Sequence, residues 1–180
     1  MVRLILAATL GASYGIYGPA FELCENQRKD TVSEEYRDSE KYEIKHWDIE
    51  RSDSLKHFIA RVNRIRRENP ALQGNLSLHF HPVDNEQLIC YSKHTEDHSS
   101  VMLVVINLDY RYKQSGWVNL SLEELGLDAD RTYQVRDLLA DTAYQWHGPR
   151  NYVELDPEKM QPISSRCCGG LTKRRSCRNI

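Results

Sequence analysis

The chain has 180 residues, with 24 Lys or Arg set against 26 Asp or Glu for a formal net charge of −2. No apolar run approaches the ~20 residues that a membrane-spanning helix requires, so we expect no membrane partner. Cys24 and Cys90 are the only cysteines before residue 161, which favours free thiols in a cytoplasmic protein over a disulfide scaffold.

The charge balance changes near the C-terminal end. Residues 161–180 contain five Lys or Arg and no acid, which leaves 19 bases, 26 acids and a net charge of −7 in residues 1–160. Neither a helical nor a strand period runs through this tail, and its cysteines lack the spacing of a metal site. One interpretation is a regulatory or nucleic-acid-binding tail, because basic runs of this kind attract phosphate-rich partners.

The N-terminal residues allow two interpretations. Met1-Val2-Arg3 followed by LILAATL has the charged and apolar regions of a signal peptide. The alternative is a helix followed by a strand, since residues 13–17 form a short aromatic and β-branched run bounded by Gly11 and a Gly-Pro turn. We predict a buried strand over residues 13–17.

Polar residues follow this predicted strand. Glu22 and Glu25 lie where (β/α)8-barrel enzymes place their active sites, at the carboxyl end of a strand. Further along, Lys41 and Tyr42 supply an ammonium group and a phenol, which hydrogen-bond sugar hydroxyls or an anionic phosphate. As a bare pattern, Lys41 and Tyr42 also fit an ordinary surface loop.

Residues 52–70 predict an amphipathic helix. Ser52 or Asp53 has the N-cap side chain, the basic residues near the end suit the negative pole of the helix, and Asn69-Pro70 ends it. We interpret the Arg-rich face as solvated and expect no nucleic-acid partner. The apolar face consists of Leu55, Phe58, Ile59, Val62 and Ile65.

After Pro70 the chain becomes a succession of short strands separated by turn-forming residues. Seven strands at this spacing are typical of an antiparallel β-sandwich, which we place over residues 71–160. Residues 121–125 predict a single helical turn between two of them. The predicted strands are 76–81, 87–93, 102–108, 116–120, 132–137, 143–147 and 151–155.

Two side-chain patterns in the predicted sandwich are candidates for a metal site and for a sugar-binding surface. His79 and His81 alternate and so face one side of a strand, but no third ligand has a suitable spacing, and we predict no metal site. Trp117 and Trp146 allow either a sugar-stacking surface or core packing, which is the commoner place for aromatic residues in a sandwich.

Three long runs carry a family resemblance. SYGIYGPAFELCEN, SEEYRDSEKYEIKHWD and SLKHFIARVNRIRRENPALQ resemble the last barrel strand, the following loop and the last barrel helix of the α-1,4-glucan:maltose-1-phosphate maltosyltransferases. That family belongs to the α-amylase superfamily. The similarity continues through DNEQLICYSKHTED, VVINLD, QSGWVNL and NYVELDP into the family's C-terminal β-domain, and so spans residue 3 to about residue 159.

The resemblance implies a fold with an α/β remnant followed by an all-β antiparallel sandwich. Residues 1–70 would contain the last strand and helix of a (β/α)8 barrel, and residues 71–160 the C-terminal β-sandwich domain. Family members end with a further strand where this chain reads QPISSR. We therefore expect residues 161–180 to be a disordered tail produced by a frameshift.

The resemblance also implies a function. The family transfers maltosyl units from maltose 1-phosphate to α-1,4-glucan with net retention, needs no cofactor and forms homodimers. Its catalytic carboxylates match positions before residue 1, so no catalytic residue is assigned here and the chain by itself is expected to be inactive. Glu22 and Glu25 match positions that shape the rim of the site, and we expect a structural hydrogen bond for Glu22. Lys41 and Tyr42 match a pair that reaches over the donor sugar. The alternative is a non-catalytic glucan-binding or interaction module, or an inactive gene remnant.

Overall fold

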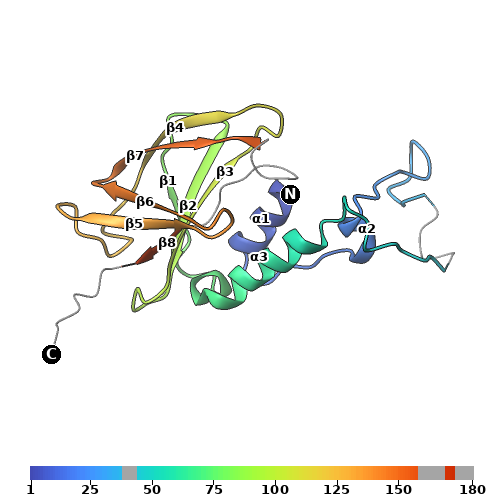
Figure 1. The fold of residues 1–180 in the computed structure, drawn as a ribbon, viewed down its shortest axis with the longest axis horizontal. Helices are drawn as coiled ribbons and strands as arrows, with labels where there is room; N and C mark the ends of the chain where they lie inside the picture. Colours follow the sequence, from blue (N-terminus) through green and yellow to red (C-terminus); the bar gives the residue numbers. More distant parts are fainter. Residues whose placement is uncertain (38–43, 158–168, 173–180) are drawn as a thin grey trace. The chain divides into compact units, whose positions relative to one another are not determined.

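The computed structural model describes residues 1–37, 44–157 and 169–172, the last four by their backbone (Figure 1). The chain divides into two compact units, one containing residues 1–13 and those from Val62 onward, the other residues 14–61. The helices are α1 (Val2–Leu10), α2 (Gly18–Glu22) and α3 (Lys56–Glu68), followed by the 3-10 helix η1 (Pro70–Gln73). The strands are β1 (His79–His81), β2 (Leu88–His94), β3 (Val101–Asn107), β4 (Gln114–Asn119), β5 (Thr132–Asp137), β6 (Thr142–His147), β7 (Arg150–Leu155) and β8 (Gly169–Thr172).

The strands form two antiparallel sheets. The larger has the order β1-β2-β3-β8-β5-β6, and β4 pairs with β7 in a two-stranded sheet that Figure 1 shows beside it. One apolar core joins the two sheets, because it contains buried residues of β2, β3 and β5 together with Val118 of β4 and Leu155 of β7. The antiparallel β-domain and all seven of its predicted strands are confirmed, with ends shifted by up to three residues.

Two segments differ from the sequence expectation. Residues 13–17 form no strand but an irregular link between α1 and α2, because no strand in the described part of the chain pairs with them. Tyr17 is accordingly exposed. Gly169–Thr172 forms β8 between β3 and β5, in a tail whose sequence has no strand period. The predicted domain boundaries at residues 70 and 160 stay predictions.

The helix α1 is anchored to the β-domain by its buried face. Leu4, Ile5 and Ala8 are almost fully buried. Thr9 donates a hydrogen bond to the carbonyl of Ile5 (2.6 Å) and shares another with the phenol of Tyr91 on β2 (2.5 Å). No helix among the described residues is long and apolar enough to cross a membrane.

Two cations satisfy the carbonyl end of α1. The last carbonyls of a helix have no partner within the helix and carry its negative pole. Arg66 of α3 donates to the carbonyls of Ala8, Gly11 (2.9 Å) and Ala12. Lys93 of β2 is fully buried and donates to the carbonyl of Leu10 (3.1 Å). Burial, and secondly the nearby charge of Arg66, lowers the pKa of Lys93.

His81 occupies a buried polar position on β1. The backbone N–H of Ser121 donates to its Nδ1 (3.2 Å), so Nδ1 carries no proton and Nε2–H donates to the hydroxyl of Ser92 (2.8 Å). Burial, and to a lesser extent the neighbouring His79, lowers the pKa of His81 from 6.5 to about 4. The imidazole therefore serves as a neutral structural group near neutral pH.

Replacing Arg66 tests the anchoring of α1. Arg66→Met removes all three hydrogen bonds to the helix end and should lower the free energy of unfolding by about 2 kcal/mol, measured by urea denaturation. Arg67→Met is the matched control, because Arg67 is exposed on the same helix and its loss should cost less than about 0.5 kcal/mol. Equal losses for both variants would contradict the anchoring role.

Acid should destabilise the protein partly through His81. The unfolded chain binds a proton at this imidazole below about pH 6.5, whereas the folded protein resists protonation down to about pH 4. The free energy of unfolding therefore rises with pH between these values. His81→Gln should flatten that rise in denaturation series at pH 4.5, 5.5 and 6.5, while His147→Gln, at an exposed histidine, should keep it. An unchanged slope in His81→Gln would exclude this cause.

Candidate functional site

The two predicted substrate-binding residues, Lys41 and Tyr42, lie outside the described residues. The structure does describe how the chain before and after them is held within the unit of residues 14–61. Arg28 and Tyr36 form an antiparallel bridge, and the ring of Tyr36 meets that of Tyr17 edge to face at 5.7 Å. The N–H of Leu55, next to α3, donates to the carbonyl of Glu22 in α2 (2.8 Å). The ends of the 23–55 connection are thereby joined.

Two carboxylates lie at and just after the end of α2, Glu22 and Glu25. Glu25 is exposed and lies 3.7 Å from Arg51. Arg51 binds Asp53 through two nitrogens (2.9 and 2.6 Å), and this hydrogen bonding raises the pKa of Arg51. Glu22 is half-buried, and its backbone carbonyl accepts from Leu55. Glu25 thus belongs to a group of surface charges, whereas the contact described for Glu22 is made by its backbone.

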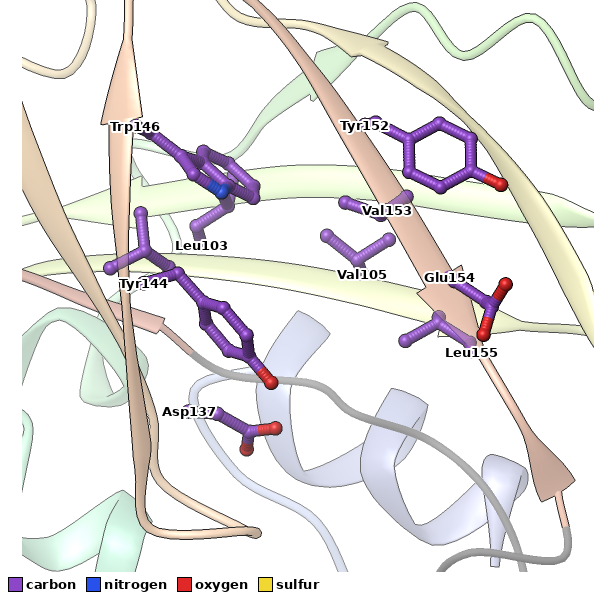
Figure 2. Close-up of a pocket in the computed structure, with 10 residues that line it drawn as sticks. Leu103, Val105, Asp137, Tyr144, Trp146, Tyr152, Val153, Glu154 and Leu155 are labelled. Carbon is purple, nitrogen blue, oxygen red and sulfur yellow. The ribbon is translucent and has the colours of Figure 1, made fainter.

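The β-domain contains an apolar cleft of about 110 Å³ between its two sheets. Figure 2 shows Tyr144 and Trp146 of β6 on one side, and Val153 and Leu155 of β7 on the other. Its lining consists of Leu103, Val105, Val135, Asp137, Tyr144, Trp146, Tyr152, Val153, Glu154 and Leu155.

Both carboxylates of this cleft have structural roles. Asp137 accepts from the backbone N–H groups of Leu139 (2.9 Å) and Ala140 (3.0 Å), which fixes the turn between β5 and β6. Glu154 forms an ion pair with Lys113 (3.4 Å) on the exposed side of β7. A retaining glycosidase-type site needs two carboxylates that flank the scissile bond as nucleophile and acid/base. Asp137 is held at the turn through Oδ1, while its Oδ2 is buried without a hydrogen-bond partner, and Glu154 is paired with Lys113; we assign neither carboxylate a catalytic role.

The two tryptophans lie in different places. Trp146 lines the cleft, where its ring meets Tyr133 edge to face at 6.4 Å. Trp117 lies on the exposed face of β4, 43% exposed, beside Tyr152 of β7. Of the two alternatives, core packing fits Trp146, while Trp117 is exposed, and the register between β4 and β7 brings Tyr152 opposite Trp117.

Neither cysteine nor histidine forms a reactive centre in the described residues. Burial raises the pKa of the Cys90 thiol to about 12, while Cys24 is a free, exposed thiol. The described residues contain no cluster of three His, Cys, Asp or Glu side chains that would hold a metal ion. His94 and His98 stack at 4.2 Å, and His98 contacts the carbonyl of Glu124 (3.1 Å).

Comparisons with known proteins show which proteins this chain resembles. Residues 80–163 match the family model described as "GLGE, C-terminal". The α-1,4-glucan:maltose-1-phosphate maltosyltransferase of Methylacidiphilum infernorum is 49% identical over 157 residues, which are 87% of this chain and 23% of that protein. Those of Chlorobaculum tepidum and Streptomyces coelicolor are 43% identical over 166 residues and 47% identical over 160, covering 25% and 23% of their lengths.

A solved structure shares a more distant likeness. The maltogenic α-amylase AmyB of Thermotoga neapolitana aligns with a TM-score of 0.49 and 14% identity over 74% of this chain and 31% of that one, too low to support an argument. The chain spans about a quarter of the length of its curated relatives. Its sequence corresponds to the C-terminal region of the α-1,4-glucan:maltose-1-phosphate maltosyltransferase family.

Proposed function

We propose that this chain is the C-terminal, non-catalytic part of a glycosyltransferase that moves maltosyl units from maltose 1-phosphate to an α-1,4-glucan. The observation that carries this proposal is the 49% identity over 157 residues to a protein named for that activity. A match of that length must include both α3 and most of the β-domain. Similarity limited to a common β-sandwich would not extend into the helices.

In this proposal the β-domain supports the helices that precede it. Arg66 and Lys93 donate hydrogen bonds to carbonyls at the end of α1, and Tyr91 is hydrogen-bonded to Thr9 in its last turn. Buried contacts of this kind resist local opening, because breaking one leaves a polar group without a partner. We propose that residues 1–70 complete the last part of a (β/α)8 barrel and that the sandwich stabilises this part.

Lys41 and Tyr42 are the proposed donor-site residues. An ammonium group gives charge-assisted hydrogen bonds to a phosphate oxygen, which are stronger than neutral ones, and a phenol both donates to and accepts from sugar hydroxyls. The reaction itself needs a nucleophile and an acid/base carboxylate, which we assign to no residue of this chain. The proposal also includes the homodimer and the cytoplasmic location, the latter supported by the free thiols of Cys24 and Cys90.

The donor-site role is testable in a chimaera. The Methylacidiphilum infernorum relative would carry the matched residues of this chain in place of its own, and glucan extension from maltose 1-phosphate would be measured. Lys41→Ala should lower kcat/KM for maltose 1-phosphate about ten- to hundredfold, because it removes a charged hydrogen-bond donor. Tyr42→Phe should lower it by about tenfold, with one neutral hydrogen bond lost. The 180-residue chain alone should show no extension.

Tyr112 and Lys113 provide the matched controls, because they are an exposed Tyr–Lys pair in the β-domain. Tyr112→Phe and Lys113→Ala should leave kcat/KM of the chimaera unchanged. An inactive but folded chimaera, or equal losses in the control variants, would count against the proposal. Glucan extension by the purified 180-residue chain would overturn its non-catalytic assignment.

A further inference from the structure

We propose that the outer face of the β4–β7 ribbon binds an α-1,4-glucan chain, at a surface separate from Lys41 and Tyr42. We call this surface the ribbon face, and the identity of its sugar rests on the proposed function. It consists of the outward side chains of three cross-strand pairs, Ser115 with Glu154, Trp117 with Tyr152, and Asn119 with Arg150.

Strand alternation creates the ribbon face. Along β4, Gly116 and Val118 are buried in the core while Trp117 and Asn119 are exposed. Along β7, Asn151 and Leu155 are buried while Arg150 and Tyr152 are exposed. Because successive side chains of a strand point to opposite faces, the core-packing residues and the ribbon face are two sides of the same two strands. Tyr152 and Glu154 of the ribbon face also line part of the cleft between the sheets.

The centre of the ribbon face is a pair of exposed aromatic rings. The ring centroids of Trp117 and Tyr152 lie 5.5 Å apart at an interplanar angle of 64°, and half of Tyr152 is accessible to solvent. The guanidinium of Arg150 lies 4.9 Å from the Trp117 ring centroid and orients that ring. Contacts within the protein thus hold Trp117 in place, so a ligand would meet a surface that is already formed.

Polar groups border the rings. Asp84 accepts a hydrogen bond from the backbone N–H of Trp117 (2.6 Å), and its other oxygen lies 4.0 Å from Arg150. A hollow of about 280 Å³ adjoins Trp117, lined by Pro82, Val83, Asp84, Trp117, Asn119 and Arg150. A carboxylate, an amide and a guanidinium therefore surround one aromatic ring, and together they both donate to and accept from hydroxyl groups.

This combination suits a sugar chain better than a protein partner. A glucan presents apolar C–H faces, which pack on aromatic rings, and hydroxyls at its edges, which need mixed donors and acceptors. A stable protein interface buries about 1,200–2,000 Å² around an apolar core. The outward side chains of the ribbon face are polar on both sides of a single aromatic pair, which is too little apolar surface for such a core.

Direct binding to the 180-residue chain tests this inference without any catalytic readout. Isothermal titration with maltoheptaose should detect binding, and Trp117→Ala and Tyr152→Ala should each weaken it by about tenfold or more. Trp117→Tyr should retain most of the affinity, since an aromatic ring remains. Tyr112→Ala, at an exposed tyrosine outside the ribbon face, should change the affinity by less than about twofold.

Thermal unfolding of each variant shows whether it is folded, and cellohexaose tests the sugar class. Absence of maltoheptaose binding, equal affinity for cellohexaose, or binding unaffected by Trp117→Ala in folded protein would each overturn the inference. Dimerisation that Trp117→Ala abolishes and maltoheptaose does not alter would instead identify a contact between copies of the chain, and would also overturn it. These outcomes are independent of the chimaera activity, so either proposal can fail alone.

Discussion

The carbonyl end of α1 is the constraint on which the arrangement of the β-domain and its helices depends. A helix that ends in the protein interior leaves carbonyl groups that must find donors. This chain supplies them from two distant elements, Arg66 of α3 and Lys93 of β2. One short helix is thereby tied to both a later helix and the central strands, through contacts separated by 55 and 83 residues.

Lys93 shows what that arrangement costs. A buried ammonium group loses the solvation that it has in water, and this desolvation lowers its pKa. The hydrogen bond to Leu10 and the negative pole of α1 offset part of the cost. The neighbouring Tyr91 and Ser92 are also fully buried, and they bond to Thr9 and His81. The strand β2 thus presents a row of polar side chains, each satisfied by a partner from another element.

The two faces of the β4–β7 ribbon carry side chains with different roles. Its inner side chains close the core and line the cleft seen in Figure 2, where Asp137 holds a turn and Trp146 packs. Its outer side chains carry the exposed aromatic pair. The proposed glucan contact belongs to the outer face of the ribbon, whereas the contacts proposed to support the helices come from Lys93 and Tyr91 of β2. The donor-site residues Lys41 and Tyr42 belong to a separate segment of the chain.

The sequence by itself determined most helices and strands, because apolar residues recur about every 3.6 residues in a helix and every 2 residues in a strand. It predicted α3 and seven strands of the β-domain, and its motifs indicated the same similarity that the family model and the relatives give. It missed β8, whose residues have no strand period, and it predicted a strand at 13–17 that finds no partner. Whether β8 and residues 13–17 form strands depends on pairing with another strand, and the local sequence pattern does not show whether such a partner is present.

Only the tertiary structure decided which side chains meet. The sequence gives no sign that Arg66 caps α1, that Ser121 fixes the tautomer of His81, or that Tyr152 rather than Trp146 lies beside Trp117. Each of these contacts joins residues far apart along the chain. Their physical reason is geometric, since strand register and helix docking bring donors to acceptors and rings to rings only after the chain has folded.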